Sequence, residues 1–237
     1  LTEEARAQAL AGPVKHILEE IARVLTPPQF SPAQAQLTFT IAATDYALKA
    51  VIVPLMHTLK QHAPGIRVAV LPVDNERLGM QFERGSIDLA LVTPETTPDG
   101  LHARALYQES YVCVMRKGHP AAKMLPLSLD QFCAQEHILV SSQASFRGAT
   151  DDALAEIGRT RRVGMSVNSF LVLPDVLSMT DMIAVIPRRM AQEQADLLVT
   201  ETPLPVPGFT KSMAWHERTH RDPAHQWIRA TLVGISQ

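Results

Sequence analysis

A segment near the C-terminal end has the residue types of a zinc hydrolase. His216, Glu217 and His220 match the pattern His-Glu-x-x-His. In zinc proteases this pattern lies on a helix, where two histidines one turn apart bind the metal and the glutamate acts as general base. Whether this chain could perform that chemistry depends on the secondary structure that carries the three side chains.

The residues around the motif predict a strand and then a new helix, not one continuous helix. Large and small side chains alternate over residues 210–215, which is typical of a strand. Asp222 and Pro223 are typical of the cap and first turn of a helix that begins after the motif. No glutamate follows Glu217, so the third protein ligand is also missing. We therefore expect no catalytic or stoichiometric metal and no peptidase activity.

Length and composition are those of an ordinary globular chain. The 237 residues allow one large domain or two small ones, with 46% hydrophobic and 19% charged residues and a net charge of -2. Cys113 and Cys133 form neither a disulfide framework nor a CxxC motif, which favours a reducing compartment. Because no apolar run could span a membrane and no signal peptide starts the chain, we expect a cytoplasmic protein without a membrane partner.

The N-terminal segment predicts a helix that pairs with a second copy of the chain. Its apolar residues recur with the spacing of a coiled-coil seam, namely Leu10, Val14, Ile17, Ile21 and Val24. A proline-rich stretch at 25–32 cannot continue the helix and reads as a linker. We interpret residues 1–30 as a dimerisation helix and linker, with packing on the chain's own domain as the alternative.

The rest of the chain alternates strands with helices and therefore predicts an α/β protein. The expected strands are nearly continuous in apolar residues, as in a parallel sheet covered on both faces, and lie at 37–43, 66–72, 87–92, 137–142, 161–167 and 182–187. Expected helices lie between them, at 75–84, 151–158, 169–179 and 188–194 among others. Two extended segments near 101–120 separate the two α/β halves.

Five segments, in this order along the chain, resemble the regulatory part of LysR-type transcriptional regulators. They are LTFTIAATDYALKAVIVPLM, ERGSIDLALV, RALYQESYVCVMRKGHPAA, SMTDMIAVIPRRM and WHERTHRDPAHQWIR. The resemblance implies two Rossmann-like subdomains joined by two crossovers, of the type 2 periplasmic-binding-protein-like class, preceded by a linker helix. It places subdomain I at 37–118 and 206–237 and subdomain II at 119–205. Regulators that sense aromatic-degradation intermediates, with the nodulation-type regulators, are the most similar branch.

The resemblance also implies a function. The chain would be the effector-binding and oligomerisation part of a ligand-responsive bacterial regulator, forming a homodimer or homotetramer through the linker helix and the regulatory domains. DNA would be bound by a winged helix-turn-helix domain expected before Leu1, and neither enzymatic activity nor a cofactor is expected. A two-lobed solute-binding protein is the alternative, against which the coiled-coil seam and the missing signal peptide both argue.

Polar residues at three strand ends are the expected effector site. In such folds ligands bind at the carboxyl ends of the strands, in the crevice between subdomains, and the resemblance implies the same loops. We expect an aromatic or carboxylic metabolite to contact Thr44, Asp45, Ser141, Ser142, Gln143, Asn168, Ser169 and Phe170. Asp45 would disfavour an anion unless its oxygens turn back toward its own helix, and helix capping alone could also explain Asp45 and Ser169.

Overall fold

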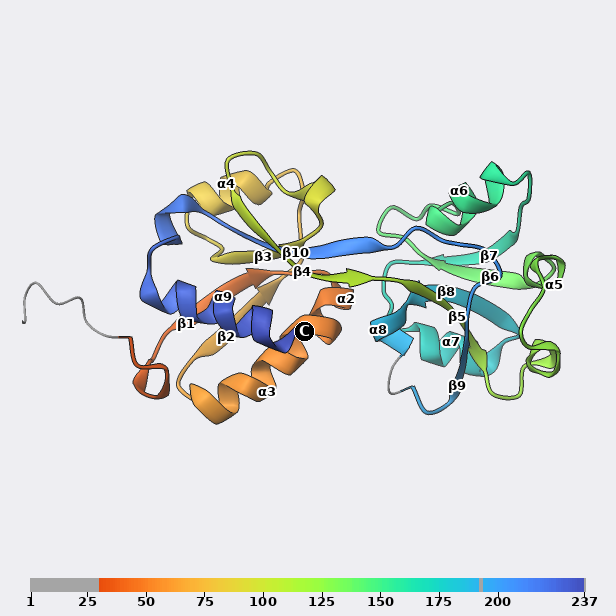
Figure 1. The fold of residues 1–237 in the computed structure, drawn as a ribbon, viewed down its shortest axis with the longest axis horizontal. Helices are drawn as coiled ribbons and strands as arrows, with labels where there is room; N and C mark the ends of the chain where they lie inside the picture. Colours follow the sequence, from red (N-terminus) through yellow and green to blue (C-terminus); the bar gives the residue numbers. More distant parts are fainter. Residues whose placement is uncertain (1–29, 192–193, 237) are drawn as a thin grey trace, which may run out of the picture.

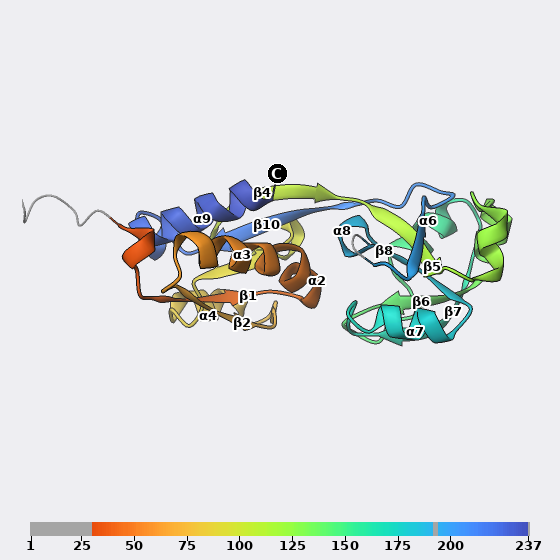
Figure 2. The same ribbon diagram turned by 90° about the horizontal axis from the view of Figure 1, so that it is seen from below.

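The computed structural model describes residues 30–191 and 194–236, which form two lobes (Figures 1 and 2). The predicted coiled-coil seam lies outside the described residues. Each lobe is built on a five-stranded sheet with helices on its faces. The α/β class and the two-lobed architecture expected from the sequence are therefore confirmed.

The first lobe contains a mixed sheet with the strand order β2-β1-β3-β10-β4. Strand β1 runs parallel to its two neighbours β2 and β3, whereas β10 is antiparallel to β3 and β4. The strands are β1 (Thr38–Ala42), β2 (Arg67–Leu71), β3 (Leu89–Val92), β4 (His102–Glu109) and β10 (Phe209–Trp215). The helices are α2 (Asp45–Ala47), α3 (Val53–His62), α4 (Leu78–Glu83) and α9 (Pro223–Ile235).

The period-two alternation of β1 divides the first lobe into two packed layers. Ile41 belongs to the apolar cluster that includes Leu55 of α3 and Ile228 of α9. Ala42, the next residue, belongs to the cluster on the opposite face with Phe82 of α4. The sheet is thus covered by α3 and α9 on one side and by α4 on the other, as a strand buried on both faces requires.

Pro54 lies in the first turn of α3, directly after a π-helical segment at Leu48–Ile52. Proline has no N–H to donate to a carbonyl one turn earlier, so it is tolerated where a regular helix begins. The helical segment that follows β1 begins after its N-cap, Thr44. It passes from α-helix to π-helix at Leu48 and returns to α-helix at Val53, where α3 begins.

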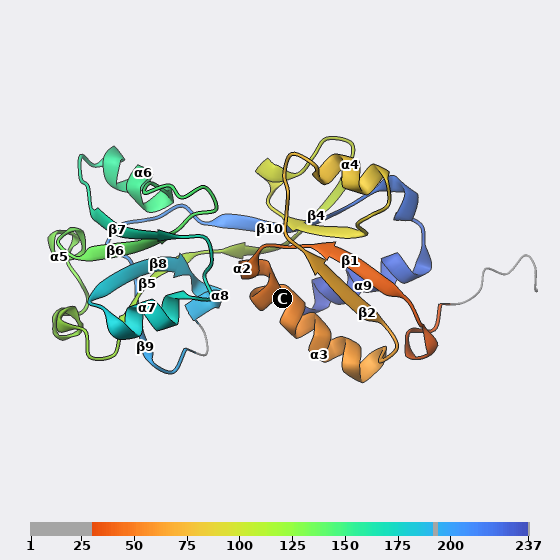
Figure 3. The ribbon, with the colours of Figure 1, turned by 180° about the vertical axis from the view of Figure 1, so that it is seen from behind.

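The second lobe repeats the scheme with the strand order β7-β6-β8-β5-β9 (Figure 3). Strand β6 is parallel to β7 and β8, and β5 is antiparallel to β8 and β9. The strands are β5 (Tyr111–Arg116), β6 (Glu136–Val140), β7 (Arg162–Val167), β8 (Met182–Pro187) and β9 (Leu197–Thr200). The helices are α5 (Leu129–Cys133), α6 (Ala149–Glu156), α7 (Leu173–Met179) and α8 (Arg188–Ala191).

The strand pairing corrects one expected boundary. The sequence interpretation kept residues up to 118 in the first subdomain, but β5 pairs with β8 and β9 of the second sheet. The chain therefore changes lobe at Ser110, between β4 and β5, and returns between β9 and β10. Because β4 and β5 are separated by one residue and both are extended, the sequence pattern could not show where the sheet changes. Strand β9 was also not predicted.

The region of the zinc-protease pattern folds as its neighbours predicted. β10 ends at Trp215, a short 3-10 helix covers Glu217–Thr219, and α9 begins at Pro223. The side chain of Asp222 caps α9 by accepting a hydrogen bond from the N–H of His225 at 2.9 Å. His216 and His220 therefore do not lie one turn apart on an α-helix. Among the described helices, none has the length and apolar character needed to cross a bilayer.

Candidate functional site

A cavity of about 680 Å³ lies between the lobes, where the parallel strands of both sheets end. Figure 3 shows the arrowheads of β1 and β8 directed toward the opposite lobe. In the first lobe, the cavity is lined by the residues that follow β1, β2 and β3 and by part of β10. In the second lobe, it is lined by residues at the ends of β6, β7 and β8 and at the start of β5. The lining residues are Ala43, Thr44, Asp45, Tyr46, Pro72, Val73, Thr93, Glu95, Tyr111, Val140, Ser142, Asn168, Phe170, Pro187, Phe209 and Lys211.

Five of the eight predicted site residues line this cavity, namely Thr44, Asp45, Ser142, Asn168 and Phe170. The other three do not. The hydroxyl of Ser141 accepts hydrogen bonds from the backbone of Gln143 and Ser145, and that of Ser169 accepts one from the N–H of Leu171. These two serines shape their own turns, and Gln143 is exposed outside the cavity. In each strand-end loop only some side chains can face the crevice, because the chain is turning.

Asp45 joins the two lobes at the edge of the cavity. One carboxylate oxygen accepts a hydrogen bond from the N–H of Tyr46 at 2.7 Å, and the other accepts one from the N–H of Phe170 at 2.6 Å. Phe170 belongs to the second lobe, so this contact spans the crevice. Because both oxygens accept from backbone donors, part of the negative charge of Asp45 is compensated without a ligand.

Lys211 is the positive charge of the cavity, and the sequence interpretation did not include it. The residue is 4% exposed, and burial lowers the pKa of its ammonium to about 8. Over the described ranges, no carboxylate forms an ion pair with it. Its ammonium lies 5.5 Å from the ring centre of Tyr46 and 5.7 Å from that of Phe209. The sequence contained one indication that Lys211 is buried. Lys211 lies two and four positions before the buried residues Met213 and Trp215, on the same alternating side of the predicted strand.

Tyr46, which lines the cavity, also belongs to a set of polar and charged side chains that are paired with one another. The hydroxyl of Tyr46 donates to the buried carboxylate of Glu109 at 2.5 Å and contacts the hydroxyl of Tyr107 at 3.0 Å. Arg189, from the second lobe, places its guanidinium 3.9 Å from the ring centre of Tyr107 and 4.0 Å from the Glu109 carboxylate. Burial, and then the bond to Glu109, raise the pKa of Tyr46, so it stays a neutral donor.

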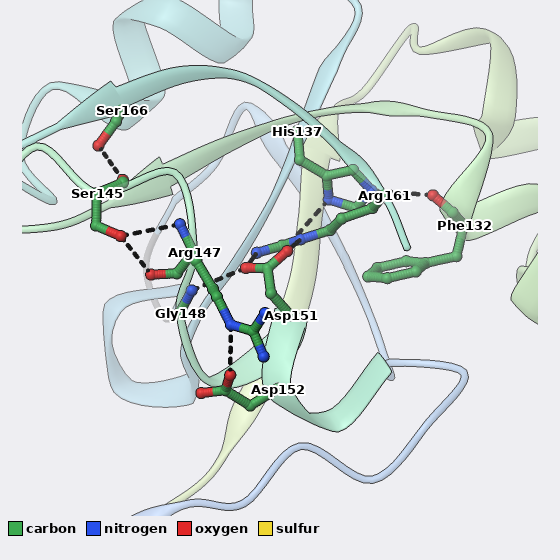
Figure 4. A network of polar contacts seen from close by, with 9 residues as sticks. All are labelled: Phe132, His137, Ser145, Arg147, Gly148, Asp151, Asp152, Arg161 and Ser166. Carbon is green, nitrogen blue, oxygen red and sulfur yellow. Dashed lines mark hydrogen bonds and ion pairs between the residues drawn. The ribbon is translucent and has the colours of Figure 1, made fainter. Parts of the chain in front are cut away.

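The loop that carries Ser142 is held by a buried polar network (Figure 4). Arg161 donates two hydrogen bonds to Asp151, of 2.8 and 2.9 Å, and a third to Nδ1 of His137 at 3.2 Å. Asp151 also accepts the N–H of Gly148, where the loop enters α6. In the middle of the loop, the carbonyl of Ser145 accepts a hydrogen bond from the hydroxyl of Ser166 at 2.7 Å.

Burial and Arg161 together set the charge states in this network. Burial alone would raise the pKa of Asp151, but the hydrogen bonds and positive charge of Arg161 and the N–H of Gly148 outweigh it and lower the pKa. Burial, and then the nearby guanidinium, lower the pKa of His137 to about 4. His137 is therefore neutral near pH 7, with Nδ1 accepting from Arg161 and Nε2 donating to the carbonyl of Phe132.

Comparison with known proteins now decides the family. Residues 32–234 match the family described as the LysR substrate binding domain. The chain belongs to the LysR-type transcriptional regulators. The HTH-type transcriptional activator NagR of Ralstonia sp is 34% identical over 230 residues, which are 95% of this chain and 76% of NagR. A Nodulation protein D from Bradyrhizobium sp. (strain ANU 289) is 31% identical over 235 residues, covering 96% of this chain and 68% of that protein.

Solved structures agree. The regulatory domain of MexT, a transcriptional activator in Pseudomonas aeruginosa, superposes with a TM-score of 0.74 at 26% identity, over 86% of this chain and all of that domain (100%). A probable transcriptional regulator from the same organism also has a TM-score of 0.74, at 30% identity, over 97% of this chain and 77% of that one. The chain is thus an effector-binding regulatory region of a transcription regulator, and its relatives are not enzymes. The solute-binding alternative is not favoured.

Proposed function

We propose that the effector of this regulator is a small aromatic carboxylate bound in the cavity between the lobes. The observation that carries the proposal is Lys211, a buried ammonium on the cavity wall with no ion pair among the residues described. A buried charge is costly unless it is paired, so an anionic ligand stabilises the site by supplying the missing partner. Asp45 and Glu109 do not take this role, because their carboxylates already have other partners.

The cavity walls favour an aromatic ring beside the carboxylate. Tyr46 packs edge-on against Phe170 and Phe209, with ring centres 6.3 and 5.5 Å away, and Tyr111 lies 6.0 Å from Phe209. All four rings line the same cavity. Aromatic side chains contact another ring favourably in edge-to-face or offset geometry. Thr44, Ser142 and Asn168 supply polar groups that can orient a substituent such as a hydroxyl.

The position of the cavity supports a regulatory mechanism. A ligand in this cavity touches both lobes, and its contacts depend on how the lobes are arranged. It favours one arrangement over another when it makes better contacts in that arrangement. Three further parts of the proposal are DNA binding through a helix-turn-helix domain, a cytoplasmic location and assembly into homodimers or homotetramers. We divide the chain into a linker at 1–30, a first subdomain at about 37–110 and 206–237, and a second between them.

The proposed site can be tested with two neighbouring polar residues. Ser142 lines the cavity and Gln143 does not, although both are exposed. A library of aromatic carboxylates should contain compounds that raise the melting temperature, since a ligand at a hundred times its dissociation constant adds about 2.7 kcal/mol. Ser142→Leu should abolish this rise, whereas Gln143→Leu should keep it. A rise that survives Ser142→Leu unchanged would place the site elsewhere.

Binding of the carboxylate should depend on pH through Lys211. Burial lowers the pKa of Lys211 from 10.5 to about 8. Between these two pH values the lysine is protonated in the unfolded chain but largely neutral in the ligand-free fold. The free energy of unfolding therefore increases as pH rises from about 8 to 10.5. The anion needs the protonated ammonium. The dissociation constant should therefore be nearly constant below pH 8 and should rise by up to about tenfold per pH unit above it. Titrations by calorimetry from about pH 6.5 to about pH 9.5 measure this, and a flat profile would exclude the pairing.

The predicted coiled-coil seam makes a separate prediction about assembly. Ile17→Asp combined with Ile21→Asp places two charges on the seam and should weaken association of the subunits, because an unpaired charge at a helix interface is strongly unfavourable. The α/β lobes should remain folded, as judged by circular dichroism. Light scattering measures the mass. If mutant and parent have the same mass at the same concentration, the N-terminal segment is not an oligomer contact.

A further inference from the structure

Three side chains with metal-binding donor atoms meet at the end of the first lobe that is distant from the second lobe. They are His102 at the start of β4, Glu217 in the 3-10 helix after β10, and His220. One donor atom from each lies within 4.8 Å of the other two. The imidazole Nε2 of His102 is already in contact with the carboxylate of Glu217.

The local backbone explains why Glu217 and His220 converge while His216 does not. A 3-10 helix has three residues per turn, so side chains three positions apart project from the same side. Glu217 and His220 have this separation. His216 is the N-cap of the turn, and its Nδ1 accepts a hydrogen bond from the N–H of Arg218 at 3.1 Å. The zinc-protease spacing therefore supplies two of the three donors, and the third comes from elsewhere.

The strand register supplies the third donor. Trp215, the last residue of β10, lies directly opposite His102, the first residue of β4. His102 is thereby held beside the turn that follows Trp215. The turn itself is fixed from two sides. Arg218 donates to the carbonyl of Phe82 at 2.8 Å, and Arg229 donates to the carbonyl of His220 at 2.7 Å. The donors thus project from an ordered backbone, and their tips are accessible because Glu217 is 63% exposed and His102 37%.

We propose that His102, Glu217 and His220 form a surface site for a divalent transition-metal ion of the zinc type. Two imidazoles and one carboxylate are a donor set that Zn²⁺ takes with a water as fourth ligand, whereas Mg²⁺ and Ca²⁺ prefer oxygen donors alone. The site revises the expectation of no stoichiometric metal, which rested on the absence of a helical motif. It carries no peptidase mechanism, because Glu217 acts as a ligand and is not left as a general base.

Metal binding requires two local changes. The rings of His102 and His220 are stacked, with centres 4.2 Å apart and planes 20° apart, and an ion in the plane of both rings requires them to turn away from each other. The indole N–H of Trp215 donates to Nδ1 of His220 at 3.1 Å, which leaves the proton of a neutral imidazole on Nε2. When Nε2 binds a metal the proton moves to Nδ1, so the bond from Trp215 must break. The indole therefore reports on the site.

Titration of the chelator-treated chain with Zn²⁺ tests the site. The chain has two tryptophans, so Trp227→Phe leaves Trp215 as the only indole. Calorimetry should give one ion per chain, and the fluorescence of Trp215 should change with the same midpoint, with no response to Mg²⁺. His102→Ala and Glu217→Gln should each weaken Zn²⁺ binding by about tenfold or more. His216→Ala should bind as the parent does, although it removes one of the three residues of the sequence motif.

Three results would overturn the proposal. They are the absence of one-per-chain binding, an affinity in His102→Ala equal to that of the parent, and a loss in His216→Ala as large as that in His102→Ala. Circular dichroism of the metal-free variants shows whether each is folded. If His102→Ala is not folded, the affinity of Glu217→Gln for Zn²⁺ tests the proposal instead. Glu217 is largely exposed, and glutamine has nearly the same size as glutamate.

Discussion

Replacement of Lys211 by methionine should weaken the binding of an aromatic carboxylate by about a hundredfold, because a hydrogen bond or ion pair to a buried charged group contributes about 1.5–3 kcal/mol. Methionine keeps most of the length and the apolar stem of lysine and removes the charge. The ligand-free variant should be at least as stable as the parent, since the buried ammonium is unpaired within the part of the chain that the structure covers. Calorimetry measures the affinity and thermal unfolding measures the stability.

A ligand analogue separates the charge effect from a change in cavity shape. The neutral amide of the same aromatic acid cannot form the ion pair, so its affinity should be nearly equal in parent and Lys211→Met. The four affinities, of the parent and of Lys211→Met for the acid and for the amide, form a double-mutant cycle. The cycle gives the interaction free energy between the ammonium and the carboxylate. Equal losses for acid and amide would show that Lys211 acts through packing, and the assignment of an anionic effector would then fail.

The sequence predicted the parts of this molecule that depend on local pattern. Apolar runs marked the parallel strands, and the carboxyl ends of those strands identified five of the eight residues expected to line the cavity. It also predicted correctly that His216 and His220 lie beyond a strand, because alternation and Asp222-Pro223 are local signals. The order of the strands in each sheet was not predicted, since pairing is not encoded in a segment by itself. The family resemblance implied only two subdomains and the return of the chain to the first.

What the sequence could not predict depends on contacts between distant segments. Lys211 lies on β10, which returns from the second lobe, so only the assembled sheet places its ammonium beside Tyr46. His102 and Glu217 are 115 positions apart and meet through the register of β4 with β10. The change of lobe at Ser110 is hidden for a related reason. Two extended segments in succession look alike whether they enter one sheet or two.

The buried pair of Asp151 and Arg161 should make the largest contribution to stability of any polar contact in the second lobe. Their side chains are 15% and 1% exposed. Asp151→Asn keeps the shape of the carboxylate but leaves the guanidinium buried with His137 as its main partner. We expect the free energy of unfolding to fall by about 3 kcal/mol or more, as is typical when one member of a buried ion pair is removed. Urea denaturation followed by circular dichroism measures the change.

The neighbouring residue is the matched control. Asp152 also pairs with an arginine, Arg147, but these side chains are 64% and 66% exposed, so Asp152→Asn should change the free energy of unfolding by less than about 1 kcal/mol. The double variant Asp151→Asn/Arg161→Met should recover part of the loss, because it removes the stranded charge together with its partner. If Asp151→Asn and Asp152→Asn have equally small effects, the buried network does not hold the loop that carries Ser142, and the order of that loop must come from the apolar packing of α6 instead.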